Sequence, residues 1–563
     1  MIFPATAIEP WQYTKSPSSW LPVDRFRKQN LSSSLKRTLD RVNVLGDEEQ
    51  NYGHSGCVNA VSWAENGNLL LTGGDDTTVR LWRVDTSDLK QEYPYVCRSV
   101  IATGHRANIF NVQMLPYSNR IVSCAGDKQI RVFDATTPSA VRDGMETEFS
   151  ARQAGVRIIR CHSDRVKKLV TEESPDVFLS LSEDGSVRQH DLRTPHQCRE
   201  SCPAPLLHMP HELSTISMSP VTPYQFVVAG ESRYGYLFDR RHIGRVLQEE
   251  WGAVPNIGED VTTCVRKFGR HPQSPKARKE GRRDHITGCR ISPTNGHEVL
   301  LTYSSDKVYL FSTKDEAHTK EDLASMAAAV LPPNSEESRT RKKRRTSSPP
   351  TGSADEPSNA GDSMDVDDDR EEDDADHEEV DDDEDGEEEE DEMSRFLNYL
   401  RREDKLNDGF MSDVPVVLPR ASYAGARNVD TVKDVNFLGP YDEHVVSGSD
   451  DGNWFMWDKV SGKLVGIYEG DETVVNVVEA HPHLPVVAVS GIDKSIKLFA
   501  PARGKSQFSR VDHADAIIEE NARLSRRSFI AYNLSSRLFS RLGALSGELG
   551  GEGSNPVIEC GTQ

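Results

Sequence analysis

The chain has 563 residues, which is more than one hydrophobic core usually spans unless a repeat architecture divides the core into small layers. Its formal net charge of −23 is mostly local, because residues 365–392 contain 22 acidic residues and one arginine, a net charge of −21. The rest of the chain carries about −2, so its overall charge gives no indication of a nucleic-acid-binding protein.

The nine cysteines are scattered along the chain, mostly within strand-like runs. Cys198 and Cys202 are the closest pair, with no second pair and no histidine at the spacing of a zinc site. We therefore expect buried free thiols and no metal or other cofactor. Residues 1–13 lack the pattern of a signal peptide and no apolar run is long enough to span a membrane, so we expect a soluble intracellular protein.

Residues 1–52 form an N-terminal extension, and residues 24–42 within it have the composition and apolar spacing of a helix. Basic residues occupy the opposite face of this predicted helix. Such a helix either packs on its own domain or docks on a partner, and the sequence favours neither. The apolar stripe consists of Phe26, Leu31, Leu35, Leu39 and Val42.

Two segments, residues 53–312 and 413–510, contain seven similar units. In the clearest unit, Phe178 to Arg193, two short strands flank a Glu-Asp-Gly turn. Each typical unit has a Gly-His pair near its start and an aromatic-Asp pair near its end, and the units repeat at a spacing of roughly 40 to 50 residues. This pattern resembles WD repeats. We therefore expect an all-β fold, a seven-bladed WD-repeat β-propeller with flanking N- and C-terminal helices, in which each repeat supplies one four-stranded blade.

An aspartate in the turn of most units can hydrogen-bond the local backbone and hold the hairpin. The strand that closes the ring is not evident, and residues 5–13 and 505–511 are both candidates. Residues 511–563 form a C-terminal helical extension and tail, in which residues 512–545 predict a helix that docks on the propeller or on a partner. The turn aspartates are Asp76, Asp127, Asp184, Asp306, Asp451 and Asp493.

Residues 313–412 interrupt the repeats, and their dense like charge and low hydrophobicity predict a disordered insert. A basic cluster within it is typical of a nuclear localisation signal, with a solvated charge patch as the alternative, so we expect a protein of the nucleus and cytoplasm. The acidic run, residues 365–392, either binds basic proteins such as histones or serves as a solvated spacer. The basic cluster consists of Arg341, Lys342, Lys343, Arg344 and Arg345.

In two consecutive units an arginine stands two residues beyond the closing aspartate, at Asp191 and Arg193 and again at Asp239 and Arg241. Residues i and i+2 of a strand share a face, so we expect each pair to project together at the end of its strand. A single pair would merely close its blade as a solvated ion pair. Two copies in neighbouring blades favour a binding surface, because an arginine held beside a carboxylate is preorganised to meet a partner.

These double Asp-x-Arg boxes resemble those of the WD-repeat substrate receptors of cullin-4 ubiquitin ligases, with His190 in place of the usual aromatic residue. The resemblance covers about residues 50–500 and is most specific in the last two blades, as at residues 446–452, where it is similar to a subgroup with a charged insert between blades five and six. It implies that the boxes, together with the N-terminal helix, bind the adaptor damaged-DNA-binding protein 1. The opposite face would recruit a protein substrate.

The sequence therefore predicts a substrate-recognition subunit of a cullin-4 ubiquitin ligase that performs no chemistry of its own. No phosphate-binding glycine loop, metal motif or nucleophile elbow is evident, so we expect no enzyme. The expected partners are the adaptor, the cullin-4 ligase and an unidentified protein substrate, with basic or chromatin-associated proteins among the candidates. Direct contact with nucleic acid or a membrane is not expected. The alternative is a nuclear WD-repeat scaffold or histone-binding protein without ligase association.

Overall fold

The computed structural model divides the chain into two units, and the larger one contains the repeats. The helix α5 (Lys320–Ala329) belongs, from Glu321 onwards, to the second unit. No helix among the described residues is long and apolar enough to cross a membrane. The structure describes residues 21–47, 53–88, 91–134, 147–149, 155–194, 202–242, 262–271, 285–329 and 413–526, and the single residues 152, 196, 198, 244 and 411.

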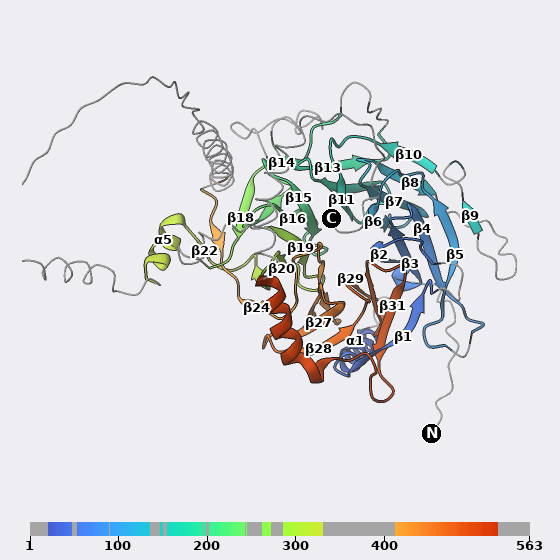
Figure 1. The fold of residues 1–563 in the computed structure, drawn as a ribbon. Helices are drawn as coiled ribbons and strands as arrows, with labels where there is room; N and C mark the ends of the chain where they lie inside the picture. Colours follow the sequence, from blue (N-terminus) through green and yellow to red (C-terminus); the bar gives the residue numbers. More distant parts are fainter. Residues whose placement is uncertain are drawn as a thin grey trace, which may run out of the picture. The chain divides into compact units, whose positions relative to one another are not determined.

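The larger unit is a seven-bladed β-propeller, as the repeats predict (Figure 1). Each blade is an antiparallel meander of four strands, and the first strand of every blade lines the central channel. Blade one contains β2 (Val58–Ala64), β3 (Leu69–Gly74), β4 (Thr78–Val84) and β5 (Tyr95–Ala102), with β9 (Thr147–Phe149) added in parallel. Blade two contains β6 (Ile109–Met114), β7 (Arg120–Ala125), β8 (Ile130–Asp134) and β10 (Gly155–Ile159). Blade three contains β11 (Val166–Thr171), β12 (Val177–Ser182), β13 (Ser186–Asp191) and β14 (Leu207–His208).

Blades four to six follow the same plan, with one interruption. Blade four contains β15 (Leu213–Met218), β16 (Gln225–Gly230), β17 (Gly235–Asp239) and β18 (Cys264–Phe268), extended by β23 (Val416–Val417) and β22 (Ala317–His318). Blade five contains β19 (Ile286–Ile291), β20 (Glu298–Tyr303), β21 (Val308–Ser312) and β24 (Ala421–Tyr423). Blade six contains β25 (Val435–Leu438), β26 (His444–Gly448), β27 (Asn453–Asp458) and β28 (Leu464–Glu469). The outer strand of blade five thus follows the insert, so the insert interrupts this blade instead of separating blades five and six.

The seventh blade is completed by a strand from the N-terminal extension. It contains β29 (Val475–Ala480), β30 (Val487–Gly491), β31 (Ile496–Pro501) and β1 (Leu39–Leu45), whose backbone pairs antiparallel with β31. Neither predicted closing segment takes this place: residues 505–511 form only an isolated bridge from Ser509 to Tyr468, and residues 5–13 lie outside the described residues. The predicted helix over residues 24–42 is therefore wrong at its end, since α1 (Leu21–Leu35) stops before β1 begins.

The described part of the C-terminal extension, residues 511–526, docks on the propeller, which was one of the two expected arrangements. Its described helix covers residues 514–526 of the predicted 512–545, and Ile517 and Ile518 pack against the apolar cluster between blades five and six. The Asn521 amide donates hydrogen bonds to the Gly425 carbonyl, at 3.0 Å, and to Asp451 Oδ2, at 2.8 Å.

A hydrogen-bonded chain of side chains inside each of the first blades explains the repeated histidine. In blade one, the Trp82 indole donates to Thr72 Oγ1 at 2.9 Å, Thr72 lies 2.8 Å from His54 Nε2, and His54 Nδ1 lies 3.0 Å from the Asp76 carboxylate. Burial lowers the pKa of His54 although Asp76 opposes this, and the same contact lowers the pKa of Asp76 against the effect of burial.

Five of the six turn aspartates hold their hairpins as the sequence predicts, whereas Asp306 of blade five contacts the side chains of Arg270 and Tyr309. In blades one, two, three, six and seven, the aspartate at the turn accepts a hydrogen bond from the backbone N–H two residues later. In blade three His190 stands where blade one has its tryptophan, and its Nε2 lies 2.7 Å from Ser180 Oγ. The departure at His190 therefore preserves the internal chain of hydrogen bonds.

Candidate functional site

The two Asp-x-Arg boxes lie at one end of the propeller, which we call the box face. In a four-stranded meander the first and third strands run in the same direction, so both end at the same face. Asp191 is the last residue of β13 and Asp239 the last of β17, the third strands of blades three and four. The box face therefore comprises the turns after the first and third strands of every blade.

In blade three the box forms a bidentate ion pair. Arg193 Nε lies 2.9 Å from Asp191 Oδ1 and Arg193 Nη2 lies 2.7 Å from Oδ2, while the Arg193 backbone N–H donates to Oδ1 at 2.9 Å. Arg193 follows the strand, so the pair is made through a turn and not along one strand face as predicted. The hydrogen bond from Arg193 lowers the pKa of Asp191, and the arginine side chain stays 68% exposed.

In blade four the same geometry is held more firmly. Arg241 Nε lies 2.9 Å from Asp239 Oδ1 and Arg241 Nη2 lies 2.6 Å from Oδ2. The Asp239 side chain is only 4% exposed, and Arg241 stacks its guanidinium 3.8 Å above the Tyr224 ring. Burial would raise the pKa of Asp239, but the hydrogen bonds from Arg241 hold it below its usual value. Both boxes thus present a fixed, exposed arginine.

Neighbouring arginines anchor the turns that carry the boxes. Arg240 turns the other way from Arg241 and forms a 2.8 Å ion pair with Glu172 of blade three. Arg157, from β10 of blade two, donates to the carbonyls of Leu192 and Thr194 at 3.2 and 2.9 Å. The two boxes are therefore tied to their neighbouring blades, which fixes them relative to each other.

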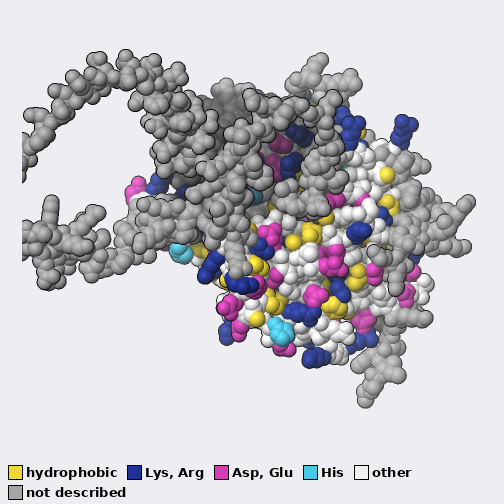
Figure 2. Space-filling view, in the orientation of Figure 1, with side chains coloured by type: hydrophobic (Ala, Val, Ile, Leu, Met, Phe, Trp, Pro, Cys, Tyr) yellow, Lys and Arg dark blue, Asp and Glu magenta, His cyan; other side chains and the backbone are white. Residues whose placement is uncertain are grey.

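Exposed apolar side chains gather on the same face, a feature that the sequence did not reveal. Each lies in α1, at the end of a third strand, or in a turn of the box face. Such residues matter because the core of a protein–protein interface is characteristically apolar and aromatic. Charged side chains of both signs lie among apolar ones on the surface seen in Figure 2. The exposed large apolar residues of the box face are Phe26, Val84, Tyr117, Val221, Tyr441 and Val460.

The helix α1 also belongs to the box face. A cavity of about 1420 Å³ occupies the channel, and its lining includes all seven inner strands, turns of the box face, and Asp24, Arg27 and Lys28 of α1. Leu31 and Leu35 on the same helix pack in the apolar cluster between blades six and seven. The helix therefore docks on its own propeller through two of its stripe residues while Phe26 remains 63% exposed.

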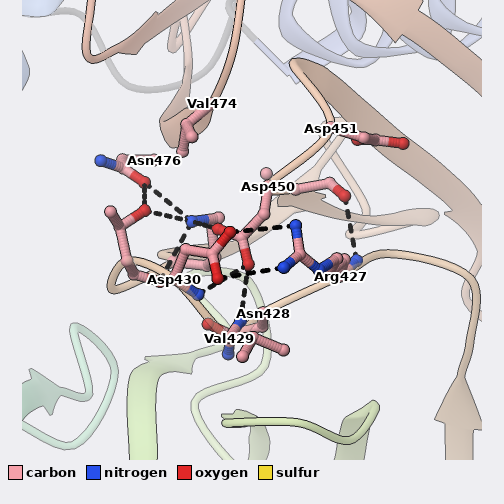
Figure 3. Close-up of polar contacts among 12 residues, drawn as sticks. Arg427, Asn428, Val429, Asp430, Asp450, Asp451, Val474 and Asn476 are labelled. Atoms are coloured by element: carbon pink, nitrogen blue, oxygen red, sulfur yellow. Dashed lines mark hydrogen bonds and ion pairs between the residues drawn. The ribbon is translucent and has the colours of Figure 1, made fainter. Parts of the chain in front are cut away.

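On the opposite face, a buried charged network fixes the loop before β25 (Figure 3). Lys433 forms an ion pair with Asp450, and both side chains are fully buried. Asp450 Oδ2 accepts hydrogen bonds from the backbone N–H groups of Val429 and Asp430, at 2.6 and 2.9 Å, and Lys433 Nζ donates to Asn476 Oδ1 at 3.0 Å. Burial lowers the pKa of Lys433 although Asp450 opposes this. Blades six and seven therefore present a rigid surface at this face.

Two further sequence predictions have different outcomes. The basic cluster Arg341–Arg345 and the acidic run lie outside the described residues. The cysteine pair does not stand apart, because the structure brings Cys161 and His196 beside Cys198 and Cys202. The sequence signal was the spacing His-x-Cys-x-x-x-Cys, which places three ligand-type residues within one short loop.

Comparison with known proteins identifies the repeats. Residues 46–83 and 96–134 match the family described as WD domain, G-beta repeat. The first two blades are WD repeats. The chain is 37% identical to WD repeat protein iqw1 of Schizosaccharomyces pombe over 278 residues. This aligned segment covers 47% of this chain and 32% of that protein. It is 31% identical to Protein ALTERED SEED GERMINATION 2 of Arabidopsis thaliana over 326 residues, and this aligned segment covers 54% of this chain and 39% of that protein.

A third relative supports the resemblance to DDB1- and CUL4-associated factors. DDB1- and CUL4-associated factor 6 of Homo sapiens is 29% identical over 272 residues, which cover 47% of this chain and 27% of that protein. The chain is thus similar over part of its length to these associated factors, and it spans about a third of the length of the three relatives named here.

Proposed function

We propose that this chain is a substrate-recognition subunit of a cullin-4 ubiquitin ligase that binds the adaptor damaged-DNA-binding protein 1 through the box face. The observation that carries the proposal is the matched geometry of the boxes: in neighbouring blades, an exposed arginine is held by a carboxylate in the same bidentate arrangement. The name of the human relative, which states an association with DDB1 and CUL4, supports the proposal.

The box face has the properties that such docking requires. In each box Nε and Nη2 are held by the carboxylate, so Nη1 points away from it toward a partner, and little side-chain entropy is left to lose on binding. The exposed apolar residues of this face supply the area that a stable interface buries.

The chain itself would contribute no chemistry. Ubiquitin transfer would take place on other subunits, and the propeller would raise the concentration of a bound substrate near them. The substrate would bind the face opposite the boxes, where the Lys433–Asp450 network holds the surface. The basic cluster Arg341–Arg345 would direct the chain to the nucleus.

The test is co-purification of the adaptor with the full chain carrying Arg193→Ala and Arg241→Ala. Truncating an arginine that is an interface hot spot costs about 2 kcal/mol or more, so we expect affinity to fall at least about tenfold for each substitution. The matched control is Arg165→Ala, an exposed arginine of blade three at the opposite face that is paired with Glu183. It should bind the adaptor normally.

Two results would overturn the proposal. One is full adaptor binding by a double variant whose circular dichroism and melting temperature match the wild type. The other is purification of the wild-type chain with histones or other basic proteins, without adaptor or cullin-4, and loss of these partners when residues 365–392 are deleted. That outcome would establish the scaffold alternative, whose charge-driven binding would weaken strongly with salt.

A further inference from the structure

Four side chains with metal-binding atoms meet beside blade three. Cys161 follows β10 of blade two, whereas His196, Cys198 and Cys202 lie in the loop between β13 and β14. Their sulfur and imidazole nitrogen atoms all lie within 4.8 Å of one another. All four residues are half-buried, so an ion from solution can reach them. The cluster joins two segments that are distant in the sequence.

The distances fit one tetrahedral ion. Zinc binds sulfur at about 2.3 Å and imidazole nitrogen at about 2.0 Å, so tetrahedral ligand sulfurs lie about 3.8 Å apart. Here Cys161 Sγ lies 3.4 Å from Cys198 Sγ and 3.4 Å from His196 Nε2. Because the four ligand atoms all lie within 4.8 Å of one another, only small side-chain movements are needed for them to coordinate a zinc ion.

The ligand set selects the metal. Three cysteines and one histidine form a complete four-ligand shell of soft sulfur and imidazole donors, which suits zinc and leaves no position for a substrate. Disulfide bonding does not account for the cluster, because three cysteines leave one unpaired and none of these three is in a disulfide bond in the structure. The arrangement is that of a structural metal site.

The surroundings are built to hold such a site. The backbone N–H of Arg160 donates to Cys198 Sγ at 3.4 Å, a contact that stabilises a thiolate ligand. Arg157 binds the carbonyls of Leu192 and Thr194, and Arg188 donates to the Pro203 carbonyl at 2.7 Å. These arginines fix both ends of the loop, and their positive charges offset the net negative charge of three thiolates around a divalent ion.

We propose that Cys161, His196, Cys198 and Cys202 bind one structural zinc ion that ties the loop after β13 to blade two. The same loop begins with Asp191 and Arg193, so the ion also fixes the position of the blade-three box. This second consequence depends on the proposed ligase function, whereas zinc binding itself does not.

The first test measures metal in the full-length protein, expressed in zinc-containing medium and purified under reducing conditions without chelator. We expect about one zinc ion per chain by mass spectrometry of the metal. Replacement by cobalt should give the visible absorption bands of a tetrahedral cobalt–thiolate centre. A wild-type protein that is folded and contains neither zinc nor the capacity to bind cobalt in this way would overturn the site.

The second test uses the variants Cys198→Ser with Cys202→Ser, and Cys264→Ser as a matched control. Cys264 is buried in blade four and outside the cluster. The double variant should lose the zinc and the control should keep it. If the double variant does not fold, His196→Ala and the cobalt spectrum of the wild type decide the question. Zinc retained by a folded double variant would refute the assignment.

A third measurement separates this site from the proposed function. Zinc content and adaptor binding are compared in the wild type and in the Arg193→Ala, Arg241→Ala variant. Full zinc content with lost adaptor binding is expected, and it supports both inferences. Full zinc content with unchanged adaptor binding supports the metal site and refutes only the role of the boxes. Zinc absent from both proteins refutes the metal site, whatever the adaptor does.

Discussion

His481 joins the last blade to the first through a neutral imidazole ring. Its Nδ1 accepts hydrogen bonds from the backbone N–H groups of His483 and Leu484, at 3.0 and 2.9 Å, so its Nε2 carries the proton and donates to the Gly67 carbonyl at 3.1 Å. Gly67 has φ +89°, and a Cβ there would lie 2.3 Å from the ring. The histidine therefore requires glycine opposite it.

Protonation of His481 should destabilise the propeller. Burial lowers its pKa from 6.5 to about 4, so the unfolded chain binds this proton more readily and stability is lost as the pH falls from 6.5 toward 4. Between pH 7 and pH 5, the free energy of unfolding of the wild type should fall about 2 kcal/mol more than that of His481→Gln. Urea denaturation at both pH values measures this difference.

The exposed neighbour His483 provides the control for this pH dependence. His483→Gln should keep the wild-type dependence, because this side chain lies in solvent. Equal dependence in wild type and His481→Gln would show that His481 does not control acid stability.

At this scale the sequence revealed local constellations and missed distant ones. Asp191 with Arg193, and Asp239 with Arg241, are two residues apart, so chain geometry alone brings them together. Cys161 reaches the other three cluster residues only because blades two and three are neighbours in the ring. The exposed apolar residues of the box face come from four blades and a helix, and only the fold shows that they share a surface.

The strand β1 shows how an element can be misread from its sequence. Leu39 continues the apolar spacing of α1, which extended the predicted helix, whereas the strand buries Leu39, Asn43 and Leu45. A register shift between Arg41 and Asn43 interrupts the simple alternation of a strand. The repeats themselves were predictable because each hairpin contains its own turn residues. The closing strand has no such local signal.

Removing β1 should open the ring. Deletion of residues 1–45 removes the fully buried Leu39 and Leu45 and exposes the edge of β31. The free energy of unfolding should fall by at least about 4 kcal/mol, and the open edge should favour aggregation. A protein that lacks only residues 1–20 keeps α1 and β1, and it should have the melting temperature of the full chain. Thermal denaturation and size-exclusion chromatography distinguish them, and equal stability of the two truncated proteins would contradict the assigned closure.

At the scale of the whole molecule, the insert is separable from the propeller. Its two ends meet in the pairing of β22 with β23, where His318 lies opposite Val416. A chain of any length between these residues therefore leaves the blades in place, since loop length affects stability weakly, by about 0.6 kcal/mol per doubling.

Replacing residues 320–414 with a short glycine-containing turn should leave the melting temperature unchanged or slightly raised. Adaptor binding should also persist, because the box face lies in the retained unit. A deletion extended through residue 424 removes β24, the outer strand of blade five, and should destabilise the protein. Calorimetry on both deletions measures the effect, and unfolding of the shorter deletion would show that the insert supports the ring.

The closure of blade seven has a consequence for synthesis on the ribosome. The strand β1 ends at Leu45, but its partner β31 begins only at Ile496. At about 5–20 residues per second, β1 waits about 20–90 s after translation before a partner exists. During that interval its edge is open to other chains, and Asp40 and Arg41 within the strand oppose such pairing. The ring can close only when nearly the whole propeller has been made, so nascent chains of this protein depend on protection until their last blade emerges.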